Sequence, residues 1–126
     1  MAGLAIACHM SSTQNRGVEV PGNTAVEKAE LASRVIGAIL QDDPASAIRM
    51  RVPEASAAHI TELRLAPQRL VGFQSGEGSF DVVYVRCSIK ASLSDEIATR
   101  VVEACEALVR EHLGQILAES TEAAEV

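Results

Sequence analysis

The hydrophobic positions of the chain follow two different periods. Between Thr24 and Gln41 apolar residues recur at a spacing of three or four, which is the period of a helix with one buried face. Thr24 and Glu27 have the spacing of a capping box, in which each side chain binds a free backbone N–H of the first turn. Pro44 disfavours helical geometry in the residue before it. The pattern therefore predicts a helix over residues 24–41.

Strand-like alternation follows this helix. Residues 48–52 alternate between apolar side chains and arginine, which is the period of a strand with one buried face. Pro53 would end this strand, because proline has no N–H for the ladder. A second strand is expected over residues 60–65, and Pro67 separates it from a third over residues 70–74. The middle of the chain therefore predicts three short strands.

The longest strand is expected over residues 80–91, after a turn whose glycines permit a reversal of the chain. Its first half is apolar on both faces, whereas its second half, from Arg86 on, is apolar on one face only. The first half should therefore be covered on both sides. We expect Phe80, Val82 and Tyr84 to lie in an interface.

Residues 94–117 predict a long amphipathic helix that ends the domain. Its apolar stripe includes Val101, Cys105 and Leu113, and a serine just before the helix can cap its first turn. His112 lies on the same stripe near the helix end. This position predicts a histidine that packs in the core or in an interface.

Together these elements predict one α+β domain of two layers, with two long helices and a sheet of three or four strands in the order α-β-β-β-β-α. The domain is expected to span residues 24–118. Residues 1–23 are expected to form a flexible segment, and residues 119–126 an acidic tail. Two helices do not cover both faces of such a sheet. We therefore expect homo-oligomers that associate through a sheet face or edge.

Charge and composition narrow the function. The chain has 126 residues and a net charge of −6, from 11 basic and 17 acidic residues. This balance repels nucleic-acid backbones and anionic membranes, and the near absence of aromatic residues leaves few platforms for stacking bases. No apolar run approaches the roughly 20 residues that span a bilayer. We therefore expect no nucleic-acid partner and no direct membrane insertion.

The sequence contains no constellation of catalytic or metal-binding residues. Cys8, Cys87 and Cys105 are widely spaced and lack the close pairs of a zinc site. We expect all three to be reduced thiols in a cytoplasmic protein, with Cys87 and Cys105 packed as small hydrophobic residues in the core. The glycines between Gly72 and Gly78 lack the Lys-Ser/Thr of a phosphate loop. We therefore assign no catalytic residue, no metal and no cofactor.

One stretch resembles the core of the alkaline shock protein family: VVYVRCSIKASLSDEIATRVVEACEALVREHLG. In that family a strand leads through a short link into a helix with the pattern E-[VI]-A-x-[RK]-V, which ends near a glycine. The matching residues are Glu96, Ile97, Ala98, Arg100, Val101 and Gly114. The preceding hairpin also resembles that of the family, so the resemblance covers residues 66–114. The chain departs from the family at Lys90-Ala91, where the family has Tyr-Gly, and no closing strand follows the helix.

This resemblance implies a bacterial, non-enzymatic protein that forms homo-oligomers, takes part in the envelope stress response and docks on a membrane-anchored partner. No catalytic residue is carried over from the family. A homo-oligomeric interaction protein is therefore our first expectation of function.

A second resemblance leads to a class of enzymes. The segment EKAELASRVIGAIL, followed by IRMRV and a later strand–helix unit, is similar to the βαβ halves of the tautomerase superfamily. Those enzymes use an N-terminal proline as a base, whereas Ala2 follows Met1 here and Pro21 is internal. The alternative function is therefore that of a small isomerase-superfamily member without the N-terminal proline.

Overall fold

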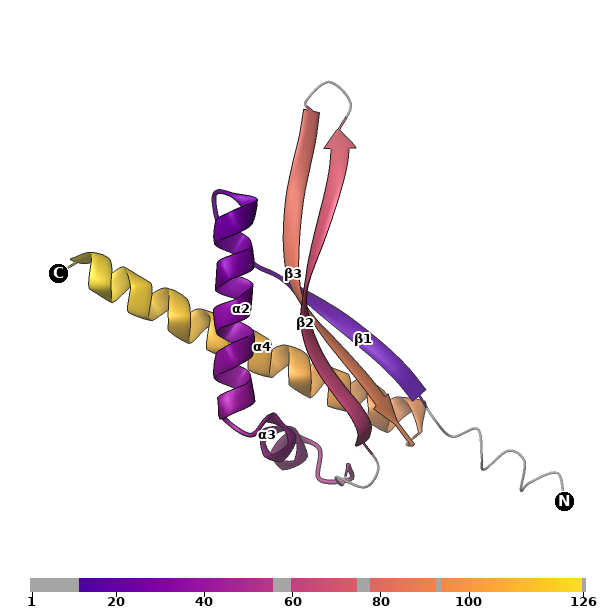
Figure 1. Cartoon of the computed structure of the whole chain (residues 1–126). Helices are drawn as coiled ribbons and strands as arrows, with labels where there is room; N and C mark the ends of the chain where they lie inside the picture. The colour runs from indigo at the N-terminus through magenta and orange to yellow at the C-terminus, as the bar shows by residue number, and fades with distance from the viewer. Residues whose placement is uncertain (1–11, 56–59, 75–77, 93, 126) are drawn as a thin grey trace, which may run out of the picture.

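The computed structural model describes residues 12–55, 60–74, 78–92 and 94–125, which form one sheet and three helices (Figure 1). In chain order the elements are β1 (Ser12–Glu19), α2 (Ala25–Gln41), α3 (Pro44–Arg51), β2 (Ile60–Gln74), β3 (Gly78–Ala91) and α4 (Asp95–Glu125). The strands of this sheet are antiparallel and lie in the order β1-β3-β2. The predicted α+β class is therefore confirmed.

The central strand β3 pairs with its two neighbours over different lengths. β1 pairs with β3 between Tyr84 and Ala91, whereas β2 pairs with it over the whole length from Gly78 to Ala91. The β2–β3 hairpin therefore extends beyond β1, and Figure 1 shows its end projecting from the body of the molecule. We call residues 69–74 and 78–83 the hairpin arm.

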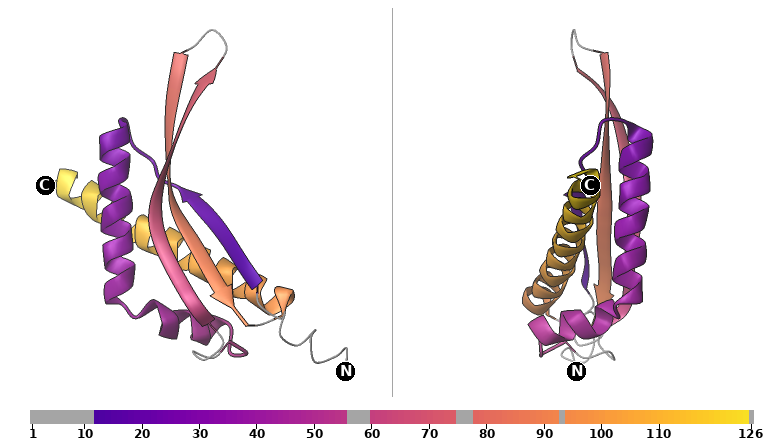
Figure 2. Two further views of the ribbon diagram at one scale, coloured as in Figure 1. Left: turned by 45° about the vertical axis from the view of Figure 1, so that its right-hand side comes forward. Right: turned by 90° about the vertical axis from the view of Figure 1, so that its left-hand side faces the viewer.

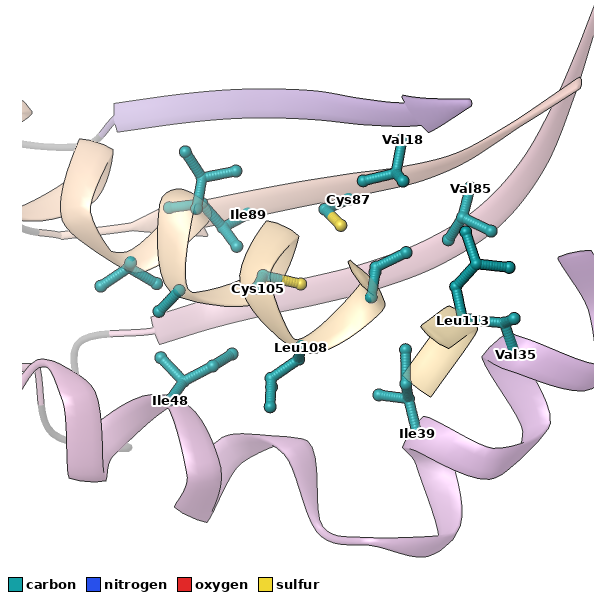
Figure 3. Packing of buried hydrophobic residues seen from close by; sticks show 14 of the residues in the cluster. Val18, Val35, Ile39, Ile48, Val85, Cys87, Ile89, Cys105, Leu108 and Leu113 are labelled. Carbon is teal, nitrogen blue, oxygen red and sulfur yellow. The ribbon is translucent and has the colours of Figure 1, made fainter. Parts of the chain in front are cut away.

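One face of β3 carries the core. The buried residues of this face alternate along the strand, and each exposes 1% or less of its surface: Val83, Val85, Cys87 and Ile89. α4 contacts β1 and β3, and α2 contacts β2, β3 and α4. Figure 3 shows Val35 of α2 and Leu113 of α4 beside Val85. The predicted alternation is confirmed, and α2 and α4 both pack against this face.

The predicted starts of the two long helices are confirmed. The Thr24 side chain accepts a hydrogen bond from the Glu27 N–H at 3.1 Å, as expected for a capping box. Ser94 precedes α4, and its hydroxyl oxygen accepts from the Ile97 N–H at 3.4 Å. α4 then continues to Glu125, where the sequence led us to expect an acidic tail instead.

A strand replaces part of the expected flexible segment. β1 covers residues 12–19, while residues 1–11 lie outside the described residues. Its Val18 is 1% exposed in the core, and Gln14 and Arg16 reach α4 through a hydrogen bond and an ion pair. An edge strand with one solvated face needs few apolar residues. The expectation of flexibility was wrong here because pairing with β3, far along the chain, supplies the backbone hydrogen bonds.

A helix replaces the strand expected over residues 48–52. The Asp43 side chain accepts from the Ser46 N–H at 3.4 Å and caps α3, and Pro44 follows at the start of the helix, where its missing N–H costs no hydrogen bond. Ile48 is fully buried, whereas Met50 is 85% exposed. The strand prediction was wrong because the apolar alternation does not correspond to a shared buried face.

β2 is one strand where two were expected. Pro67 lies within it and is paired with Val85 of β3. An edge strand accepts a proline, because a residue whose N–H would point away from the sheet does not contribute to the ladder. The described elements therefore follow the order β-α-α-β-β-α, which corrects the predicted order α-β-β-β-β-α.

We expect Ile48→Ala to lower the free energy of unfolding by about 2–4 kcal/mol, because it removes a fully buried side chain. Met50→Ala should change it by less than about 0.5 kcal/mol, because Met50 is exposed. Urea unfolding followed by circular dichroism measures both. In a strand the two side chains would share one face, so equal losses for the two variants would contradict the helix.

Candidate interaction surface

The face of the sheet opposite the helices is the candidate interaction surface, which we call the outer face. Its residues alternate along β3 with the four buried core residues, and the strand register assigns their neighbours. The described residues of the outer face are Thr13, Asn15, Gly17 and Glu19 in β1, Val82, Tyr84, Arg86, Ser88 and Lys90 in β3, and Glu62, Arg64, Ala66, Gln68 and Leu70 in β2. All of these residues are half-buried or exposed.

Three apolar side chains gather where the outer face meets the hairpin arm. Leu70 is directly paired with Val82, and Tyr84 follows on the same face of β3. Leu70 is 47% exposed, and the other two are half-buried. None of the three belongs to the described residues that pack against the core. We call Leu70, Val82 and Tyr84 the apolar strip.

Tyr84 is positioned by the glycine beside it. A Cβ atom added to Gly17 would lie 3.3 Å from Tyr84 Cδ1, so the tyrosine ring occupies the space that a side chain at this position would fill. The ring therefore lies across β1 as well as β3. This contact widens the apolar strip toward the edge of the sheet.

The rest of the outer face is mainly polar and includes five charged residues. Arg64, Arg86 and Lys90 are cationic and Glu19 and Glu62 are anionic, so the face has one net positive charge in a chain whose net charge is −6. The other parts of the molecule are therefore strongly acidic. A second acidic molecule is therefore repelled less at this face than by the remaining surface taken as a whole.

The opposite face of the hairpin arm has a different character. Val71 is 57% exposed there, near an ion pair in which Arg69 Nε lies 2.8 Å from Asp81 Oδ1. The hydrogen bond from Arg69 holds the pKa of the Asp81 carboxyl below its usual value. Lys28 of α2 donates to the Asp81 carbonyl oxygen at 2.9 Å. The ion pair joins the two strands of the arm, and the Lys28 contact ties the arm to the body of the molecule on its helix side.

The structure brings together two of the four residues that the sequence predicted for an interface. Val82 and Tyr84 share the outer face, and no helix of the described residues covers it, so within the described chain β3 is covered on one side only at this point. Phe80 is paired with Gly72, and its side chain lies outside the described residues. Sequence reasoning missed Leu70, because only the hairpin register shows that it faces Val82.

His112 lies on the helix side of the molecule, in a contact within the chain. One ring nitrogen, Nδ1, is 2.8 Å from the Leu108 carbonyl oxygen, and the other, Nε2, is 3.1 Å from Asp42 Oδ2. Both partners are acceptors, so an imidazole with protons on both nitrogens satisfies both contacts. Asp42 is the C-cap residue of α2. His112 therefore links the middle of α4 to the end of α2.

Two buried thiols face each other between β3 and α4 (Figure 3). Cys87 and Cys105 are both 0% exposed. The hydrogen bond with Cys105, together with burial, raises the pKa of the Cys87 thiol above its usual value. Within the described residues there is no group of three or more His, Cys, Asp or Glu side chains that could hold a metal ion. The thiols act here as core residues.

Comparisons with known proteins identify no relative from which a function could be inferred. No protein-family model matches the chain, and no significant similarity was found among curated proteins or solved structures. None of the helices in the described ranges has the length and hydrophobicity of a membrane span. The outer face and its apolar strip are therefore the features from which a function is argued.

We expect the contact between His112 and Asp42 to appear as a coupling energy in a double-mutant cycle. His112→Ala and Asp42→Ala should each lower the free energy of unfolding at pH 6, and the coupling should be about 0.5–1.5 kcal/mol, the value of a hydrogen bond of this kind. Urea unfolding of the wild-type protein, the two single variants and the double variant measures this coupling energy. Additive losses would show that the two side chains do not interact in solution.

We expect Cys87 and Cys105 to resist alkylation in the folded protein. The thiolate is the reactive form, and burial together with the raised pKa keeps Cys87 protonated at pH 8. Iodoacetamide treatment followed by peptide mass spectrometry should find both residues unmodified in buffer and modified in urea. Modification of Cys87 at equal rates in both conditions would contradict the buried arrangement.

Proposed function

We propose that the chain is a non-enzymatic interaction protein that forms homo-oligomers through the outer face of its sheet. The observation that carries this proposal is the apolar strip of Leu70, Val82 and Tyr84, on a face that the chain's own helices leave uncovered in the described residues. An antiparallel sheet tolerates water on one face when that face is polar. The outer face is polar along β3 from Arg86 to Lys90 and tolerates water there, whereas the apolar strip is not polar and favours contact with another molecule.

The free edges of the sheet support the same proposal. β1 and β2 each have a neighbour on one side only in the described sheet, and β3 lacks β1 beside the hairpin arm. Exposed strand edges and apolar strand faces are ready sites of association. The nearly neutral charge of the outer face allows two acidic molecules to approach each other there.

The proposal extends to the cellular role that the resemblance to the alkaline shock protein family implies. Residues 66–114, which carry that resemblance, include most of the outer face on β2 and β3. We place the protein in the bacterial cytoplasm, in the response to envelope stress, with a membrane-anchored protein as a further partner. The resemblance supports this part of the proposal.

The oligomer should depend on Leu70 and not on its neighbour Val71. Leu70→Glu puts a charge into the apolar strip and should convert the oligomer into a monomer at micromolar concentration. Val71→Glu is the matched control, because Val71 is even more exposed and lies on the opposite face of the same strand. Sedimentation velocity of the wild-type protein and the two variants measures their oligomeric states.

A wild-type monomer at micromolar concentration would contradict the proposal as a whole. Equal dissociation of both variants would place the contact on the arm in general and not on the outer face. Circular dichroism and urea unfolding of each variant check that the substitution has left the fold intact.

A further inference from the structure

The strand β1 lies at an edge of the sheet. Among the described elements it contacts β3 and α4, and Figure 2 shows it on the far side of β3 from β2. The N–H of Val20, just after β1, donates to the Val83 carbonyl oxygen at 2.8 Å. Backbone groups alternate in direction along a strand. The even-numbered residues of β1 therefore turn their N–H and C=O groups toward β3, and the odd-numbered residues turn theirs away from the sheet.

These odd-numbered residues form the free edge of β1. They are Thr13, Asn15, Gly17 and Glu19, and all of them are exposed. Within the described residues, none of their outward backbone groups has a backbone partner. The contacts of β1 with α4 include those of Gln14 and Arg16, which are even-numbered and lie on the helix side of the sheet. A further strand can therefore add to the sheet at this edge.

The free edge of β2 is interrupted by a proline. Val85 turns its backbone groups toward β1, so its partner Pro67 in β2 turns its own away from the sheet. Proline has no N–H, so a donor is missing in the middle of the edge that a further strand would use. Prolines on edge strands protect sheets against association. β2 is therefore a poor site for a further strand.

The free edge of β3 beside the hairpin arm is covered by a lysine. Asp81 lies two residues before Val83, so its backbone groups point to the same side, where β1 does not extend. Lys28 Nζ of α2 donates to the Asp81 carbonyl oxygen at 2.9 Å and occupies the acceptor that a further strand would use. Of the three free edges in the described sheet, that of β1 alone has neither a proline nor a covering side chain.

We infer that the free edge of β1 pairs antiparallel with the same edge of a second copy, so that two sheets of three strands become one continuous sheet. The two copies are then related by a two-fold axis, and outward N–H groups meet outward C=O groups. The partner strand is β1 because the other two edges of a second copy are interrupted. β1 contains one arginine and one glutamate, so its own charge adds no repulsion between chains of net charge −6.

This inference rests on the proposed function for its partner, a second copy, and adds a second contact to the oligomer. The axis of the β1 contact is perpendicular to the sheet, whereas the axis of a contact between two outer faces is parallel to it. Two perpendicular two-fold axes are those of a D2 tetramer. A single edge contact does not offset the cost of association at micromolar concentration. A pair joined by its outer faces presents two such edges, and both engage in the tetramer.

The variant Asn15→Pro tests the β1 contact, because it removes an outward N–H and leaves the hydrogen bonds between β1 and β3 in place. It should convert the wild-type tetramer into a dimer. Asn15→Ala is the matched control, because it removes the same side chain but keeps the N–H, and it should remain a tetramer. Sedimentation velocity and native mass spectrometry measure the number of copies, and circular dichroism checks that each variant is folded.

Hydrogen exchange followed by NMR tests the same contact without a substitution in β1. The amide of Asn15 should exchange at least about tenfold more slowly in the wild-type protein than in the Leu70→Glu monomer, because only the wild-type protein pairs its β1 edges. The amide of Arg16 should be protected in both proteins, because it faces β3. Equal exchange of Asn15 in both proteins would overturn the inference, also where Asn15→Pro fails to fold.

The outcomes separate the β1 contact from the proposed function. A wild-type dimer that Leu70→Glu dissociates and Asn15→Pro does not would overturn the β1 contact and leave the proposed function standing. A tetramer that persists in Asn15→Pro would likewise overturn the β1 contact. A dimer that Asn15→Pro dissociates and Leu70→Glu does not would support the β1 contact and overturn the contact through the outer face. A wild-type monomer would overturn both.

Discussion

The packing of the helices against one face of β3 is the constraint on which the rest of the structure depends. Val85 and Cys87 are fully buried on this face, and Cys105 and Val109 of α4 are buried with them. Burial of such side chains is the main source of stability in a small domain. Because α2 and α4 both pack on the same face, the described helices leave the outer face to solvent or to a partner.

Because the described helices cover one face of the sheet only, the side chains that make contacts within the chain lie on the helix side. The ion pairs that join α4 to β1 and α3, Arg16 with Glu103 and Arg51 with Glu111, lie on the helix side. The thiols and His112 are likewise used for contacts inside the chain. The outer face combines a cluster of apolar side chains with cations, and this combination supports an interaction function.

The elements that could be predicted are those whose signals are local. The α2 helix follows from a capping box and a helical period, and the β2–β3 hairpin from a glycine turn between apolar strands. β1 could not be predicted, because its hydrogen bonds come from β3, which lies more than sixty residues away. For α3, the cap at Asp43 and the proline after it were present in the sequence, but the alternation was given more weight.

The features of the candidate surface likewise divide into those that the sequence predicts and those that depend on contacts between distant segments. The amino-acid sequence by itself determined that β3 has one apolar face and that Val82 and Tyr84 lie on the other, because side chains alternate along a strand. Only the tertiary structure decided that the helices share one side of the sheet, that Leu70 faces Val82, and that α4 runs past α2. The physical reason is that period is a property of neighbouring residues, whereas strand register and helix placement result from contacts between distant segments.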